Sequence, residues 1–169
     1  NDAMASFDND SGKRYKRNNK LPEVPTFKSY QKLLLELIDS LSDISNIGLC
    51  TIPPIGENKD SAVNNHVKKY NEFIELTAKN KNITLLPVSR LLWDDLSIRT
   101  YPSKSDYDPS SLPIIRRIYG GIFHHYIFKR SWDDVAQSKG QWLLFDQIHL
   151  SERGAKIVFN IAKKYISSI

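Results

Sequence analysis

One short apolar run, Ile47-Gly48-Leu49-Cys50-Thr51-Ile52, comes to an end at Pro53-Pro54. The run is apolar on both faces, so it predicts a strand that is buried on both sides, as in a parallel sheet. A second run, Ile83-Thr84-Leu85-Leu86-Pro87-Val88, repeats this pattern. A third and shorter apolar run is Trp142-Leu143-Leu144-Phe145. We therefore expect a small sheet with two clear strands and a short third.

Helical patterns alternate with these runs. Thr26 is suited to capping a helix whose apolar residues recur at three- and four-residue steps on one face. They are Phe27, Tyr30, Leu33, Leu34, Leu37, Ile38 and Leu41. Between the first two runs, a second helix has an inward face of Val63, Val67, Tyr70, Phe73, Ile74 and Ala78. Strand–helix alternation of this kind predicts an α/β fold with right-handed crossovers.

A further helical pattern closes the chain, and Ser151 is suited to cap it. Its buried side consists of Ile157, Val158, Ile161, Ala162, Tyr165 and Ile166. Residues 8–25 differ from these patterns, because they are polar and are interrupted by Gly12, Pro22 and Pro25. That stretch predicts a loop.

The stretch between Trp93 and Gly140 interrupts the alternation. Residues 101–113 carry three prolines and predict a loop, whereas residues 114–127 have helical spacing with a broad apolar face. Gly120-Gly121 weakens this helix in its middle. The favoured interpretation is a helix packed on the sheet, since apolar stripes at this spacing usually face a core. The alternative is a cap over a substrate pocket or a surface for a partner.

The composition predicts one ordinary globular domain over residues 1–169. The chain is 40% hydrophobic and 25% charged, with a net charge of +5. Its basic residues are scattered, so we expect a solvated surface and no nucleic-acid partner. The single cysteine, Cys50, excludes an intramolecular disulfide and is expected to be a buried, inert thiol. The sequence has no cluster of metal ligands and no phosphate-cradling glycine loop, so we expect no cofactor.

The N-terminal sequence bears on location. No run is long and apolar enough to span a bilayer. The first six residues lack the basic start and the apolar centre of a signal peptide, and the first of them is Asn1 rather than methionine. We expect an N-terminal truncation or processing. The sequence leaves the location open between the cytoplasm and the outside of the cell.

Asp146 and His149 lie three residues apart, between the third apolar run and the closing helix. A carboxylate in this setting can accept a hydrogen bond from one imidazole nitrogen and leave the other free as a general base. The spacing alone also fits a structural pair, a surface loop or, with further ligands, a metal site. For the other histidines we expect an exposed position at His66 and a core or boundary position at His124-His125.

Residues 146–154, Asp-Gln-Ile-His-Leu-Ser-Glu-Arg-Gly, resemble the last sequence block of the SGNH (GDSL-type) hydrolases. That block reads Asp-x-x-His and carries a Gly early in the closing helix. Asn1-Asp2 resembles the end of the same family's Gly-x-Asn-Asp block. Further similarity lies in Pro53-Pro54-Ile55-Gly56-Glu57 and in Arg130-Ser131-Trp132-Asp133-Asp134. The resemblance therefore extends over most of the 169 residues.

This resemblance implies a three-layer, flavodoxin-like fold, with a parallel sheet flanked by helices and incomplete at its N-terminus. It implies hydrolysis of a small-molecule or lipid-like carboxylic ester through an acyl-enzyme. By the same resemblance His149 is the general base, Asp146 is the residue that orients it, and the Asn1 side-chain amide is an oxyanion-hole donor.

The nucleophile of that family is missing from the sequence. Its Gly-Asp-Ser block has no counterpart, because Asp10-Ser11-Gly12 lies in a polar stretch with no strand before it to aim the serine. One hypothesis is a serine esterase or lipase-like hydrolase whose serine lies upstream, so that this chain alone is inactive. The alternative is an inactive, truncated relative that binds a partner or ligand through the apolar face of residues 114–127.

Overall fold

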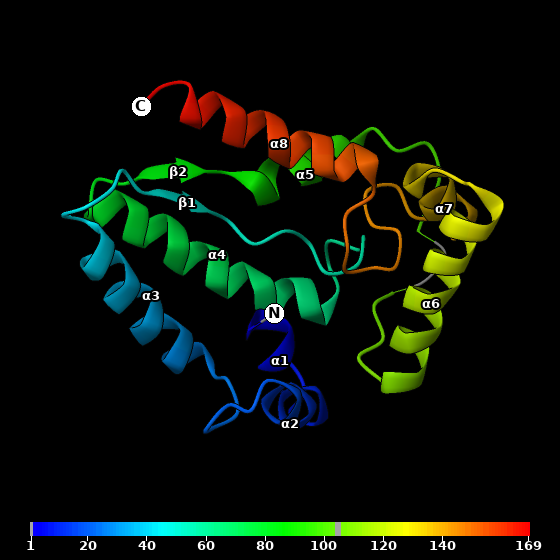
Figure 1. Ribbon diagram of the computed structural model, residues 1–169, viewed down its shortest axis with the longest axis horizontal. Coiled ribbons are helices and arrows are strands. Elements are labelled where there is room, and N and C mark those ends of the chain that lie inside the picture. The colour runs from blue at the N-terminus through cyan, green and yellow to red at the C-terminus, as the bar shows by residue number, and fades with distance from the viewer. Residues whose placement is uncertain (1, 104–105) are drawn as a thin grey trace.

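The computed structural model describes residues 2–103 and 106–169 (Figure 1). Its helices and strands are, in order, α1 (Asp2–Ala5), α2 (Asn9–Asn18), α3 (Phe27–Leu41), β1 (Gly48–Cys50), α4 (Ala62–Asn80), β2 (Thr84–Leu86), α5 (Val88–Ser97), α6 (Ser111–Phe128), α7 (Trp132–Ser138) and α8 (Glu152–Ile166). Helices predominate in the described residues. They surround one small sheet, as expected for an α/β protein.

The sheet consists of β1 and β2, which pair in parallel, with Leu49 opposite Leu85 at the centre of the register. Helix α4 connects the two strands and packs against both, whereas α8 contacts β2. Figure 1 shows α4 and α8 on opposite sides of the strands. The two clear strands and the parallel crossover are therefore confirmed, and each strand is shorter than its apolar run.

The predicted third strand is wrong. Residues 142–145 form no strand, although Leu144 makes an isolated antiparallel bridge with Leu150. The backbone N–H groups of Trp142, Leu143 and Leu144 donate to the carboxylate of Glu57. A side chain thus takes the hydrogen bonds that a neighbouring strand would otherwise receive, and the apolar run stays a loop.

The loop predicted for residues 8–25 is also wrong, since α2 occupies residues 9–18. Asp8 caps this helix by accepting a hydrogen bond from the backbone N–H of Ser11, and Lys16 and Arg17 lie in its last turn. A cap at one end and cations at the other favour a helix even where few apolar residues are available. The capping of α3 by Thr26, in contrast, is confirmed, with a reciprocal bond to Ser29.

The inward face predicted for α4 is confirmed at Val63, Val67, Tyr70, Ile74 and Ala78, which are all buried, whereas its sixth member, Phe73, is only half-buried. The face predicted for α3 is correct only in part. Ile38 is its buried member, whereas Leu33 is 62% and Leu37 is 55% exposed. Helix α3 therefore packs along a narrower stripe than its apolar spacing predicts.

Cys50 is exposed, so its predicted burial is wrong. Successive side chains of a strand point to opposite faces, and Leu49 is the buried residue of β1 while Cys50 lies on the other face. Ser151 is the N-cap residue of α8, but its side chain makes no capping hydrogen bond. Its hydroxyl is buried instead, at 3.5 Å from the carbonyl oxygen of Trp142.

In the described part of the chain, helix α6 packs against α7 rather than on the sheet, so the favoured interpretation of residues 114–127 is wrong. Figure 1 shows α6 beside α7 at one edge of the molecule, beyond the ends of the strands. Its exposed apolar residues are Ile115, Tyr119, Ile122, Phe123, Tyr126, Ile127 and Phe128. Several of them surround a hollow of about 590 Å³. Gly121 of α6 lies against the ring of Phe145. The apolar face of the helix is exposed to solvent.

Among the described residues, no helix is both long enough and apolar enough to cross a membrane.

Candidate active site

Asp146 and His149 form a hydrogen-bonded pair in the loop that precedes α8. The Oδ2 atom of Asp146 lies 2.7 Å from Nδ1 of His149. The Asp146 side chain is fully buried, whereas 57% of the His149 side chain is exposed. The carboxylate is thus shielded from water while the imidazole reaches the surface. A base and the group that orients it require this arrangement.

Backbone hydrogen bonds fix the other oxygen of the Asp146 carboxylate. Its Oδ1 atom accepts the N–H groups of Ile148, at 3.0 Å, and His149, at 2.7 Å. The turn needs a positive φ of 76° at Gln147, a conformation that side-chain-bearing residues rarely adopt. The strained residue lies between the two members of the pair. Such strain is typical of functional turns.

The electrostatics of the pair favour charge on both members. The hydrogen bond to Asp146 is the main reason why the pKa of His149 is raised from 6.5. Burial lowers that pKa and the charge of Asp146 raises it further. For Asp146 the largest single influence is burial, which raises the pKa of its carboxyl. Hydrogen bonds from the His149 ring and from two backbone N–H groups, with the charge of His149, outweigh burial, and the net pKa is lowered from 3.8. Asp146 is therefore ionised at neutral pH.

With Nδ1 engaged, Nε2 is the nitrogen of His149 that is available to a substrate or a nucleophile. It has no hydrogen-bond partner among the described residues. The imidazole is stacked on Phe145, with ring centroids 5.8 Å apart and planes inclined by 21°. Phe145 in turn contacts Trp132, and Trp132 is stacked on His125 of α6. A row of rings therefore connects the candidate base to α6.

The remaining candidates are not joined to this pair. Asn1 lies outside the described residues. Ser11 is 3% exposed on α2, and its hydroxyl donates to the carbonyl oxygen of Pro109 at 3.4 Å, which agrees with its rejection as nucleophile. Within residues 2–103 and 106–169, no serine hydroxyl is hydrogen-bonded to His149. The described residues thus contain a candidate base with a carboxylate hydrogen-bonded to it, and no serine at that base.

The other histidines have structural environments. His66 is half-buried, so its predicted exposure is wrong: α1 packs on α4 there, and the Ser6 hydroxyl lies 2.9 Å from its Nε2 atom. His124 and His125 are half-buried, as expected for boundary positions. Nδ1 of His125 lies 2.7 Å from the carbonyl oxygen of Arg130. In the part of the chain that the structure describes, no group of His, Cys, Asp or Glu side chains has the arrangement of a metal site.

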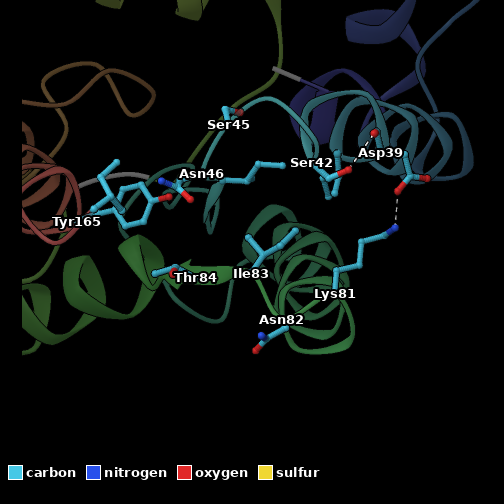
Figure 2. A pocket seen from close by; sticks show the side chains of 12 residues that line it. Asp39, Ser42, Ser45, Asn46, Lys81, Asn82, Ile83, Thr84 and Tyr165 are labelled. Carbon is cyan, nitrogen blue, oxygen red and sulfur yellow. Dashed lines mark hydrogen bonds and ion pairs between the residues drawn. The ribbon is translucent and has the colours of Figure 1, made fainter.

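A pocket at the opposite end of the strands is a poorer candidate. Figure 2 shows this hollow of about 430 Å³, with Asn46, Asn82 and Thr84 around it. It lies where β1 and β2 begin, whereas ligands of open α/β sheets bind beyond the carboxyl ends of the strands. Its charged residues, Asp39 and Lys81, form an ion pair with each other. The Asp146–His149 loop adjoins Gly56, beyond the carboxyl end of β1, and is therefore the better-placed site.

Sequence reasoning gave no role to Glu57, although its carboxylate holds the loop that contains the pair. The sequence signal was present, since Glu57 is an acidic residue that follows a buried strand in a Pro-Pro-Ile-Gly-Glu segment. It is 4% exposed. Its partners, Arg99 and residues 142–144, are far away in sequence, so no local pattern identifies them.

One comparison with known protein families covers most of the chain. The family model described as GDSL-like Lipase/Acylhydrolase matches residues 1–162. Searches of curated proteins and of solved structures gave no match. The matched range contains β1, α4, β2, the Asp146–His149 pair and most of α8. The chain belongs to the GDSL-like lipase/acylhydrolase family.

Proposed function

We propose that this chain provides the acid–base half of a serine esterase that hydrolyses carboxylic esters through an acyl-enzyme. The hydrogen bond of 2.7 Å between buried Asp146 and exposed His149 carries the proposal, together with the family membership. The substrate class is a small-molecule or lipid-like ester, as the family description suggests.

The mechanism follows from the roles of the two imidazole nitrogens. Nε2 of His149 takes the proton of the attacking serine hydroxyl as the serine oxygen bonds to the ester carbon. The buried carboxylate of Asp146 stabilises the imidazolium that results. His149 then gives this proton to the leaving alkoxide, and an acyl-enzyme remains. The same nitrogen then takes a proton from water as the water oxygen bonds to the acyl carbon, and returns it to the serine oxygen as the acyl–serine bond breaks, which releases the acid and restores the serine.

Two parts of the proposal lie outside the described residues. We assign the nucleophile to a serine in sequence upstream of this chain, which would also add strands to β1 and complete a three-layer, flavodoxin-like fold. We assign an oxyanion-hole role to the Asn1 side-chain amide. Donors of this kind act on the charge that develops at the carbonyl oxygen, and removing one costs about a hundred- to a thousand-fold in rate.

The exposed face of α6 is assigned to the acyl chain or to a partner. Its hollow is lined by Tyr119, Phe123 and Tyr126, and the row of rings from His125 to Phe145 leads from α6 to His149. A second function, as an inactive relative that binds through this face, is favoured by the absence of a serine at His149 among the described residues.

The test is an assay of the intact coding sequence with a short-chain aryl ester. We expect turnover from a product with a Gly-Asp-Ser block upstream, and none above background from the 169-residue chain. His149→Ala should lower kcat by at least about a thousand-fold, because removal of one member of such a triad leaves only binding and oxyanion contacts.

His66→Ala is the matched control, since His66 is another histidine with a side-chain hydrogen bond but belongs to the α1–α4 contact. It should leave kcat close to the wild-type value, because His66 is hydrogen-bonded to Ser6 and to neither Asp146 nor His149. Full activity of the His149→Ala variant, or an upstream sequence without the serine block, would sink the enzyme proposal and leave the binding function.

A further inference from the structure

Glu57 is a buried carboxylate whose hydrogen bonds go to a distant loop. Its side chain is fully buried, and its carboxylate faces the backbone N–H groups of residues 142–144. Oε1 accepts the backbone N–H groups of Trp142, Leu143 and Leu144 at 2.8, 2.6 and 2.9 Å. Three successive N–H groups that converge on one anion form an anion-binding nest. Here the anion is a side chain of the same protein.

Arg99 compensates the charge of this carboxylate. Its Nη1 atom lies 2.7 Å from Oε2 of Glu57, and the Arg99 side chain is only 13% exposed. An isolated buried carboxylate is unfavourable, so the ion pair and the three N–H groups together make the burial tolerable. Within the described residues, the hydrogen bonds of the carboxylate go either to Arg99 or to the loop.

Further backbone hydrogen bonds connect the segment that Glu57 holds to the Asp146–His149 pair. Leu143 accepts the N–H of Ser151 through its carbonyl oxygen at 2.7 Å, and Phe145 donates its N–H to the carbonyl oxygen of His149 at 3.0 Å. The two arms of the loop are thus paired, with Asp146 at the tip. Gly56, the neighbour of Glu57, donates its N–H to the carbonyl oxygen of Gln147 at 2.7 Å. Glu57 therefore holds one arm of the loop, and Gly56 holds its tip.

We infer that Glu57, with Arg99 as its counterion, is a positioning residue for the Asp146–His149 pair. It acts through the backbone of residues 142–144 and touches neither member of the pair. Without the carboxylate, the part-buried N–H of Trp142 and the buried N–H groups of Leu143 and Leu144 lose their acceptor, and the arm that leads to Asp146 loses its fixed place. The inference rests on the proposed function for its significance in catalysis, but its physical content concerns the geometry of the pair.

The test is proton NMR of the isotope-labelled 169-residue chain. An Nδ1 proton held by a carboxylate gives a strongly downfield resonance in the wild-type protein. In Glu57→Gln, the amide NH₂ faces Arg99 or the loop N–H groups, so two donors meet. We expect that resonance to disappear and the pKa of His149 to return toward 6.5, its ordinary value. Neither readout depends on turnover, so failure of the ester-hydrolase proposal leaves this test intact.

Asp95→Asn is the matched control. Asp95 accepts a hydrogen bond from the indole N–H of Trp142 and pairs with Arg153, so it also holds this tryptophan, but through its side chain. We expect the downfield resonance to remain in this variant. Its loss there as well would mean that any disturbance near Trp142 loosens the pair, and would overturn a specific role for Glu57.

A folded Glu57→Gln variant that keeps the resonance at its wild-type position would also overturn the inference. If Glu57→Gln does not fold, Arg99→Met decides the matter, because it keeps the carboxylate and removes its counterion. Without Arg99, Oε2 of Glu57 loses its hydrogen bond and its counterion, so the carboxylate is no longer held in place against the loop. A weakened resonance at pH 7 supports the inference, and an unchanged one contradicts it.

Discussion

The Asp146–His149 loop and helix α6 lie close together in chain order but are held in opposite ways. In the loop, the polar residues Asp146, Gln147 and Ser151 are at most 2% exposed. Hydrogen bonds join its two arms to each other, its tip to Gly56 and one arm to Glu57. In α6, large apolar residues such as Tyr119 are up to 67% exposed. Polar groups are thus buried where geometry has to be fixed, and apolar groups are exposed where nothing in the described residues covers them. The contrast is between a loop whose geometry is fixed by hydrogen bonds and a helix face that is open to solvent.

Alanine at two helical glycines should give the largest stability difference between the regions. Gly154 of α8 lies against the loop, and a Cβ there would be 2.7 Å from the carbonyl oxygen of Leu143. Gly154→Ala should lower the free energy of unfolding by about 2–3 kcal/mol, because neither backbone can yield without strain. At Gly120 of α6 a Cβ would meet nothing within 4 Å, so Gly120→Ala should raise it by about 0.5–1 kcal/mol.

Urea unfolding followed by circular dichroism measures both values. Equal effects at the two glycines would contradict the contrast, since the loop would then be as free to move as the exposed side of α6. A loss at Gly154 without a gain at Gly120 would indicate that α6 is covered in solution.

The same contrast explains what sequence reasoning could find. The fold elements with a buried apolar face were predictable, as in α4, where Val67, Tyr70 and Ile74 face the core. Asp146 and His149 could be singled out because their contact is local and because residues 146–154 resemble a known sequence block, whereas the spacing alone was ambiguous. Residues 142–145 were assigned to a strand because an apolar run does not reveal its hydrogen-bond acceptor. The acceptor is Glu57, 85 residues away from Trp142.

Two further errors have physical causes of the same kind. Helix α2 has few apolar residues, and its close contact with α1 relies on a glycine: a Cβ at Gly12 would lie 2.7 Å from the carbonyl oxygen of Ala5. A search for apolar periodicity misses such a helix. In α6 the spacing of apolar residues correctly predicted a helix, but such spacing shows only which residues share a face. Whether another element covers that face depends on the rest of the fold.

The pH dependence of stability should show a smaller effect, confined to the loop. His149 has a raised pKa in the folded protein, so its contribution is complete below 6.5 and is lost as the pH rises through the folded value. Asp146 has a lowered pKa, so its contribution is present above 3.8 and is lost as the pH falls through the folded value. The charged pair is therefore most stabilising between about pH 4 and 6.5.

His149→Gln should accordingly be more destabilising at pH 5.5 than at pH 9. The difference should stay below about 1 kcal/mol, because water screens the exposed half of the imidazole. Thermal unfolding at the two pH values measures it. His125→Gln on α6 is the control, since its ring nitrogen lies by a carbonyl oxygen rather than a carboxylate. A larger loss for His149→Gln at pH 9 would contradict the raised pKa.

The smallest effect is expected on the open face of α6. Tyr119 is 67% exposed, so Tyr119→Ser should change the free energy of unfolding by no more than about 0.5 kcal/mol, as at other surface positions. Urea unfolding at two protein concentrations gives the value and shows whether it depends on association. A destabilisation above about 1 kcal/mol that grows with concentration would mean that a second copy covers this face. In that event α6 would be buried like the loop, and the two regions would differ only in which chain supplies the contacts.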